Sequence, residues 1–153
     1  MKYKDSEIVK CQMMIRKPAK DVFEAFIDPK ITTNFWFTKS SGKLEKGETV
    51  KWEWEMYGHS TEVLVKDIVE NRKISIQWDN PPTMVDFEFE VLAENQTYVT
   101  IKQYGFNNSG DKLIESIKDN TGGFTTVLDG VKAYLEHNIN LNLIADKYPQ
   151  KTK

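Results

Sequence analysis

The sequence has a single cysteine, Cys11, among its 153 residues. One thiol forms no intramolecular disulfide and cannot supply the group of thiolates that structural zinc sites commonly use. Histidine is scarce as well, since His59 and His137 stand far apart with no cluster of acidic residues beside either. The common metal-protease, nucleophile-elbow and phosphate-loop motifs are absent from the sequence. We therefore expect no metal site and no cofactor.

Long apolar runs are also missing. No stretch approaches the roughly 20 residues of a membrane-spanning helix, and the first ten residues, MKYKDSEIVK, lack the apolar segment of a secretory signal. The charges sum to −2, from 21 Lys and Arg against 23 Asp and Glu, so there is no basic excess for binding duplex DNA. We expect a cytoplasmic protein that neither binds nucleic acid nor inserts into a membrane.

Aromatic residues, in contrast, are plentiful: the chain has four Trp, six Tyr and eight Phe. These large rings bury much apolar area and compensate for a hydrophobic fraction of 39%. The length corresponds to about one domain. We predict a single domain over residues 1–153, with a core at about 8–146 and loose tails at about 1–6 and 148–153.

Period-two alternation of apolar and polar residues predicts strands through the first two thirds of the chain. In the segment 49–57, Val50, Trp52, Trp54 and Met56 share the inward face. The alternating segments lie at about 8–16, 49–57, 62–69, 74–78, 85–91 and 99–106. In 85–91 the apolar residues, Val91 included, are expected to face inward, and Asp86, Glu88 and Glu90 are expected to face water. A change of parity predicts a bulge before Ile68.

Helical spacing occurs in two regions. Pro18 opens a helix that Asp28-Pro29 ends, and a second short helix is expected from Ile31 to Trp36. Near the C-terminus, Ser109 caps a short helix, and Gly122-Gly123 leads into a long amphipathic helix at about 121–145. The predicted α+β fold is a curved antiparallel sheet of about six to seven strands around the long C-terminal helix, with two short helices after the first strand.

Three motifs in this order resemble the AHSA-type proteins, named for the activator of the ninety-kilodalton heat-shock protein's ATPase, in the START-like (SRPBCC) superfamily. They are IRKPAKDVFEAF (15–26) with Asp28-Pro29 and Phe35-Trp36, GETVKW (47–52), and GFTTVL (123–128) continuing as LEHN (135–138). The resemblance covers about residues 8–146 and implies the helix-grip fold. Phe35 and Phe124 stand where many members carry tryptophan, and Asn138 stands where they carry glycine.

The inward side chains beneath the long helix are candidates for lining a ligand cavity. Aromatic walls with a few polar groups are typical of small-molecule sites, although inward aromatics also simply fill cores. The candidate ligand-binding residues are Trp36, Trp52, Trp54, Met56, Trp78, Phe87, Phe89, Gln103, Phe124 and Val127.

Four other residues could carry chemistry. Gln103 should point inward, where its amide needs partners. Asp67 would be a buried acid if no bulge precedes Ile68, and the bulge favours an exposed position. His59 lies in a turn, where it is solvated or stands at the mouth of a pocket. Cys11 alternates inward, as a small core residue does.

Three functions remain open from the sequence. The first is binding of a small hydrophobic molecule without catalysis. The second, implied by the resemblance, is an interaction protein linked to a chaperone and to the stress response. The third is a cyclase-like or hydrolase-like enzyme, which needs an acid–base pair in the cavity, and the inward positions offer only Gln103 and Asp67 for that role.

Overall fold

The computed structural model describes residues 8–150, so the expected tail at 1–6 and the end of the second tail at 151–153 lie outside the described residues. Seven antiparallel strands form one sheet in the order β1-β7-β6-β5-β4-β3-β2. The strands are β1 (Val9–Ile15), β2 (Lys39–Ser40), β3 (Thr49–Trp54), β4 (His59–Val69), β5 (Lys73–Trp78), β6 (Thr83–Ala93) and β7 (Gln96–Tyr104). The helices are α1 (Ala19–Ile27), α2 (Pro29–Thr32), the 3-10 turn η2 (Glu55–Tyr57), α3 (Gly110–His137) and α4 (Leu143–Lys147).

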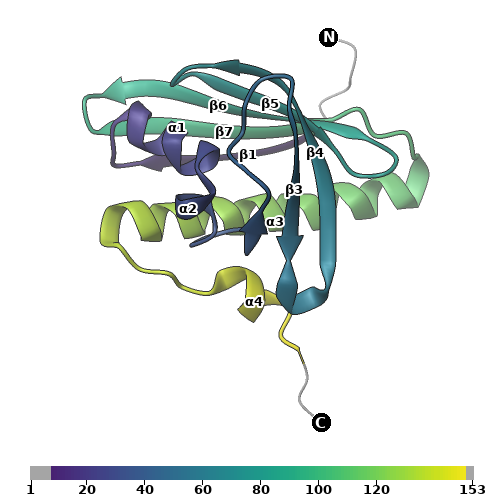
Figure 1. Ribbon diagram of the computed structural model, residues 1–153. Coiled ribbons are helices and arrows are strands. Elements are labelled where there is room, and N and C mark those ends of the chain that lie inside the picture. The colour runs from purple at the N-terminus through teal and green to yellow at the C-terminus, as the bar shows by residue number, and fades with distance from the viewer. Residues whose placement is uncertain (1–7, 151–153) are drawn as a thin grey trace.

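The long helix α3 runs along one face of the sheet, and the chain then turns back to place α4 beneath the ends of β3 and β4 (Figure 1). The register sets which side chains meet α3. Cys11, Ile101, Phe87 and Ile74 lie opposite one another across four neighbouring strands, and all four are buried. The predicted helix-grip fold is therefore confirmed, with the core between the sheet and the helices.

Helix α1 begins after Pro18, as predicted, and buries Val22, Phe23 and Phe26. The predicted second short helix is present, but its expected range of 31–36 is wrong. Helix α2 is Pro29–Thr32, because the side chain of Asp28 accepts from the backbone N–H of Lys30 at 3.0 Å and so caps the helix immediately. Trp36 consequently lies in the turn after α2 rather than on a helix.

The C-terminal helix also differs from the prediction. One helix of 28 residues, α3, replaces the expected short helix and the separate helix at 121–145, and Gly122-Gly123 lies inside it. Burial of Phe124 and its neighbours against the sheet outweighs the low helix propensity of two glycines. The helix ends at Asn138, which adopts the left-handed φ of 55° that asparagine tolerates. Ile139, expected on the helix stripe, lies beyond the end and is exposed.

Three strand predictions need correction. Strand β3 ends at Trp54, so Met56 lies in η2, and His59 opens β4 instead of standing in a turn. Asp86 was expected to face water but is buried, because Ser75 donates a hydrogen bond to it at 2.8 Å and Tyr104 covers it. Val91 was expected inward but is 65% exposed, since it lies close to the end of the β6–β7 hairpin.

The predicted bulge is present, with a register shift between Val65 and Asp67. It turns Asp67 outward, where the carboxylate pairs with Lys46 at 3.2 Å. The expectation of an exposed Asp67 is therefore confirmed.

Side chains of α3 cover the free edge of β1. Lys132 Nζ donates to the carbonyl of Met14 at 2.9 Å, and Glu136 Oε2 accepts from the backbone N–H of Arg16 at 2.8 Å. Lys132 and Glu136 also pair with each other at 2.6 Å. The contact satisfies backbone groups that an edge strand leaves open, and it fixes α3 relative to the sheet.

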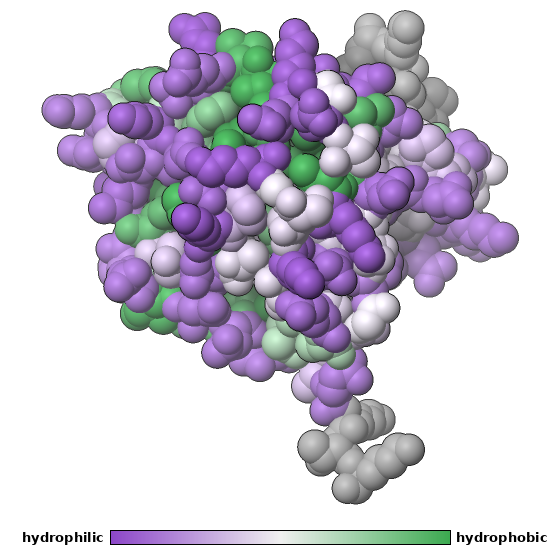
Figure 2. Space-filling model, in the orientation of Figure 1, coloured by the Kyte–Doolittle hydropathy of each residue, from purple (hydrophilic) through white to green (hydrophobic). Residues whose placement is uncertain are grey.

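The view in Figure 2 shows a surface that is mostly hydrophilic, with smaller apolar areas between the polar side chains. None of the helices in residues 8–150 is both long enough and apolar enough to cross a membrane.

Candidate binding site

Beneath α3 the inward rings form an aromatic cluster, which consists of Trp36, Phe37, Trp52, Trp54, Trp78, Phe87 and Phe124. Trp36 is at its centre, with its ring centroid 4.8 Å from that of Trp52 and 6.0 Å from those of Trp78 and Phe124. Phe37 stacks on Trp52 at 4.5 Å. Most of these contacts are edge-to-face or tilted, which is the geometry that aromatic rings prefer. The rings therefore pack on one another and form a continuous apolar wall.

An open hollow of about 620 Å³ adjoins this wall, and we call it the mouth. Four segments that are distant in sequence meet there. Its lining consists of residues 59–62 of β4, residues 79–81 with Thr83, residues 106–108 before α3, and Ser116 and Asn120 on α3.

Three connections join the mouth to the aromatic cluster. On α3, Ser116, Asn120 and Phe124 are spaced by four residues and so share one face of the helix. On β5, Trp78 is directly followed by Asp79. Between β3 and β4, the rings of Trp54 and His59 lie 5.6 Å apart. The polar groups of the mouth therefore lie next to one end of the aromatic cluster, and the rings in the lining itself are those of His59 and Phe106.

Polar atoms without a partner gather at this junction. Within residues 8–150, Trp78 Nε1, Gln103 Oε1 and Asn108 Oδ1 are buried and have no hydrogen-bond partner. Gln103 is fully buried, and its amide nitrogen donates to Thr83 Oγ1 at 2.9 Å. Asn108 Nδ2 donates to Ser116 Oγ at 3.1 Å and to the carbonyl of Lys112 at 3.5 Å, which fixes the direction of its oxygen. Native proteins rarely leave buried polar atoms unpaired.

The mouth also contains titratable groups. Asp79 is exposed to the hollow, yet the surrounding protein partly removes it from bulk water, which raises the pKa of its carboxyl. The nearby His59 offsets part of that effect. A carboxyl and an imidazole in one hollow can exchange protons with a bound molecule, which is the pair that a cyclase-like or hydrolase-like activity needs.

The structure brings together most of the predicted site residues but not all of them. Trp36, Trp52, Trp54, Trp78, Phe87 and Phe124 belong to the aromatic cluster, and Val127 is buried one turn of α3 further along. Met56 and Trp36 both line a small hollow of about 100 Å³ beside α4, which is separate from the mouth. Phe89 packs on Phe23 and Phe26 of α1. That these side chains contact a ligand stays a prediction.

Two further expectations concern single residues. Cys11 is buried, with its thiol 3.4 Å from the carbonyl of Thr121, and burial raises the pKa of that thiol. It is therefore a protonated core residue. His137 is exposed at the end of α3, as expected.

Sequence reasoning left His59 either solvated in a turn or at the mouth of a pocket, and it missed Asp79, Asn108 and Asn120. Asp79 and Asn108 lie in loops, and Asn120 lies on the unbroken helix α3. A continuous helix would have placed Asn120 one turn before Phe124, so the mistaken break at Gly122-Gly123 concealed it.

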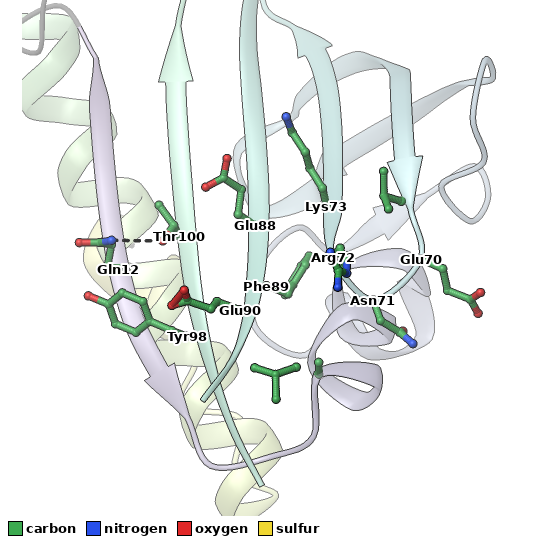
Figure 3. A pocket seen from close by; sticks show the side chains of 13 residues that line it. Gln12, Glu70, Asn71, Arg72, Lys73, Glu88, Phe89, Glu90, Tyr98 and Thr100 are labelled. Atoms are coloured by element: carbon green, nitrogen blue, oxygen red, sulfur yellow. Dashed lines mark hydrogen bonds between the residues drawn. The ribbon is translucent and has the colours of Figure 1, made fainter. Parts of the chain in front are cut away.

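A second hollow, of about 1060 Å³, lies at the face of the sheet that points away from α3 (Figure 3). Gln12, Thr100, Glu88 and Lys73 stand opposite one another across β1, β7, β6 and β5. Several polar groups here have partners: Gln12 donates to Thr100 at 3.2 Å, Glu88 pairs with Lys102 at 3.2 Å, and Lys73 pairs with Asp86 at 3.7 Å. None of the unpartnered buried atoms in the described part of the chain lies in this hollow. The mouth is therefore the better candidate, although it is smaller.

Comparison with known proteins identifies the family. Residues 16–136 match the family model described as Activator of Hsp90 ATPase homolog 1-like protein. Protein SSP2350 from Staphylococcus saprophyticus is 26% identical, with a TM-score of 0.78 over 88% of this chain and 95% of that one. The Aha1 dimer from Colwellia psychrerythraea is 20% identical, with a TM-score of 0.73 over 85% and 96% of the two chains.

CalU16 from Micromonospora echinospora shares the fold at 13% identity, with a TM-score of 0.68 over 90% of this chain and 79% of that one. No curated protein sequence matches the chain. The family model spans most of the chain, and the structural matches have the same fold. The chain therefore belongs to the Activator of Hsp90 ATPase homolog 1-like family, within the START-like (SRPBCC) superfamily.

Proposed function

We propose that the protein binds a small, mostly hydrophobic molecule whose apolar part lies against the aromatic cluster and whose polar end lies in the mouth. The observation that carries this proposal is the position of Trp78 Nε1 and Gln103 Oε1, two buried atoms without a hydrogen-bond partner in residues 8–150, on residues that pair with or bond to Thr83 in the lining of the mouth. A volume of about 620 Å³ is in the range of small-molecule sites. We expect the protein to meet this ligand in the cytoplasm.

The energetics favour a ligand with both apolar and polar parts. An unpaired buried polar group costs about 1–3 kcal/mol, and a ligand that pairs with Trp78 or Gln103 recovers part of this cost. Apolar contact with the rings adds roughly 25 cal/mol per Å² removed from water. Because the rings already pack on one another, the apolar part lies at the edge of the cluster that Trp54, Trp78 and Phe124 form, rather than among the central rings.

Titration with 2-naphthylmethanol, a flat apolar probe with one hydroxyl group, tests the proposal. We expect saturable one-to-one binding by calorimetry. Trp78→Phe, which keeps a ring but removes the indole N–H, should weaken binding at least threefold, whereas Val91→Ala at the exposed hairpin should not change it. Absence of binding at millimolar probe, or equal affinity for Trp78→Phe and the unmodified protein, contradicts the proposal. Native mass spectrometry of freshly purified protein then identifies a natural ligand.

Trp54 provides a second test of the same site. We expect Trp54→Ala to lower probe affinity more than it lowers stability, because the ring lies beside His59 at the mouth. A loss of stability with unchanged affinity would make Trp54 a core residue only.

The family match favours one alternative, contact with an Hsp90-type chaperone. A pull-down with purified Hsp90 distinguishes the two functions. Failure to bind at micromolar concentration counts against the chaperone role and leaves the ligand proposal intact.

A further inference from the structure

The mouth has an unusual charge composition for a polar hollow. Its lining contains two carboxylates, Glu62 and Asp79, one imidazole, His59, and neither Lys nor Arg. Carboxylate, phosphate and sulfate groups bind most strongly to the charged donors of Lys or Arg, which this lining lacks, and the two carboxylates repel them. The lining therefore opposes an anionic group.

The two carboxylates are not neutralised by the protein. Within residues 8–150, neither Glu62 nor Asp79 forms an ion pair with a Lys or Arg side chain, whereas Asp67, Asp86, Glu88 and others do. Reduced contact with bulk water raises the pKa of the Asp79 carboxyl, and only His59 acts against this. A cation bound beside Asp79 would supply the missing countercharge.

The buried oxygens that lack a hydrogen-bond partner within residues 8–150 also favour a group that donates hydrogen bonds, as a cation does. Asn108 Oδ1 and Gln103 Oε1 are hydrogen-bond acceptors, so each needs a donor. An ammonium group has three N–H donors and no acceptor, which matches a site containing the carboxylate of Asp79 and the amide oxygen of Asn108. Trp54 lies beside His59, and Trp78 directly precedes Asp79, so both indole rings are near the mouth. Indole attracts cations more strongly than the rings of Tyr and Phe do.

We propose that the polar end of the ligand is a protonated amine that binds in the mouth between the carboxylate of Asp79 and the amide oxygen of Asn108. This inference rests on the proposed function, and it adds the charge of the ligand. A neutral hydroxylated group is the competing chemistry, and the experiment below distinguishes the two.

Three probes with the same ring system form the test: 2-naphthylmethylamine, 2-naphthylmethanol and 2-naphthoate. At pH 7.5 and low salt we expect the amine to bind at least fivefold more tightly than the alcohol, and the acid to bind most weakly. Added NaCl should weaken binding of the amine but not of the alcohol, because salt screens an exposed charge pair.

Asp79→Asn tests the residue. Asparagine has the same shape and tolerates the left-handed φ of 70° at this position, so the loop should keep its conformation. We expect the amine to lose its advantage while the affinity for the alcohol changes less than twofold. Glu90→Gln removes one negative charge from an exposed site outside the mouth, and it should keep the amine's advantage.

The outcomes separate the two claims. If the alcohol binds as tightly as the amine, or if Asp79→Asn keeps the amine's advantage, the inference is wrong and the binding function stands. If the acid binds most tightly, the inference is likewise wrong. If none of the three probes binds, the proposed function itself fails, and the inference fails with it.

Discussion

Replacing Glu136 with glutamine tests how α3 is held on the edge of the sheet. Its Oε2 atom accepts from the Arg16 backbone N–H at 2.8 Å and from Lys132 Nζ at 2.6 Å, and the side chain is only 10% exposed. Glutamine keeps the shape and one oxygen that can accept from Arg16, but it loses the charge that binds Lys132.

The expected magnitude follows from these two bonds. Removing a hydrogen bond to a charged group costs about 1.5–3 kcal/mol, and we reduce this figure because Lys132 is one-third exposed. The free energy of unfolding should fall by about 1–2 kcal/mol at pH 7, since the bond from Arg16 remains. For a domain of this length that corresponds to a decrease in Tm of roughly 3–6 °C.

The effect should depend on pH. Burial acts to raise the pKa of Glu136, but the hydrogen bonds from Lys132 and Arg16 and the charge of Lys132 outweigh it, so the folded-state pKa is lowered. A lowered carboxyl pKa contributes stability that is complete above the unfolded value of about 4.3 and is lost as the pH falls through the folded-state value. The difference between the unmodified protein and Glu136→Gln should therefore shrink on acidification.

Urea unfolding followed by tryptophan fluorescence at pH 7.0 and at pH 3.5 measures this difference. Glu90→Gln, at an exposed position, is the matched control and should change stability by less than about 0.5 kcal/mol. The reasoning is refuted if Glu136→Gln costs less than about 0.5 kcal/mol at pH 7.0, or if its cost is the same at both pH values.

Substitutions at three further positions test other features of the structure. Gly130→Ala should destabilise the protein by about 1–3 kcal/mol in urea unfolding, because the added Cβ would lie 3.1 Å from Phe35 Cβ and 3.2 Å from its carbonyl oxygen; an unchanged midpoint would show that α3 shifts freely. Tyr57→Phe removes the hydroxyl that bonds to two carbonyls of the C-terminal segment. Amide hydrogen exchange should then increase in α4 but not in the central strands, and unchanged exchange in α4 would contradict the contact. Asn138→Ala should cost about 1 kcal/mol and Asn138→Gly should cost nothing, because the φ of 55° strains alanine; equal stability of the two variants would argue against a left-handed helix end.

The sheet could be predicted from the sequence because period-two alternation reports burial directly. Val50, Trp52 and Trp54 are buried as the alternation requires, and the parity change before Ile68 located the bulge. The alternation gave the wrong burial where contacts between distant segments determine it. Asp86 has the sequence pattern of an exposed strand residue, yet the side chains of Ser75 and Tyr104 bury it.

Helix α3 shows a second limit. Two adjacent glycines lower the helix propensity by about 1 kcal/mol each, and sequence reasoning therefore placed a break there. The buried residues that follow, from Phe124 to Val131, hold the helix on the sheet and override that preference.

The mouth could not be predicted from local patterns, because its lining comes from four segments that only the fold brings together. Asp79, Asn108 and Asn120 each read as ordinary loop or helix-surface residues in the sequence. What distinguishes these three residues is their position beside the aromatic cluster, and no periodic pattern in the sequence indicates that position.

The most direct test of ligand binding is the indole N–H signal of Trp78 in ¹H–¹⁵N NMR spectra during titration with 2-naphthylmethylamine, assigned by its loss in Trp78→Phe. Binding between the aromatic cluster and the mouth predicts that this signal shifts in a saturable way, because the buried Nε1 has no hydrogen-bond partner among residues 8–150. Trp52, which lies deeper and stacks on Phe37, should shift less. A titration that saturates while the Trp78 signal stays unchanged would show that the ligand binds elsewhere and would contradict the proposed site.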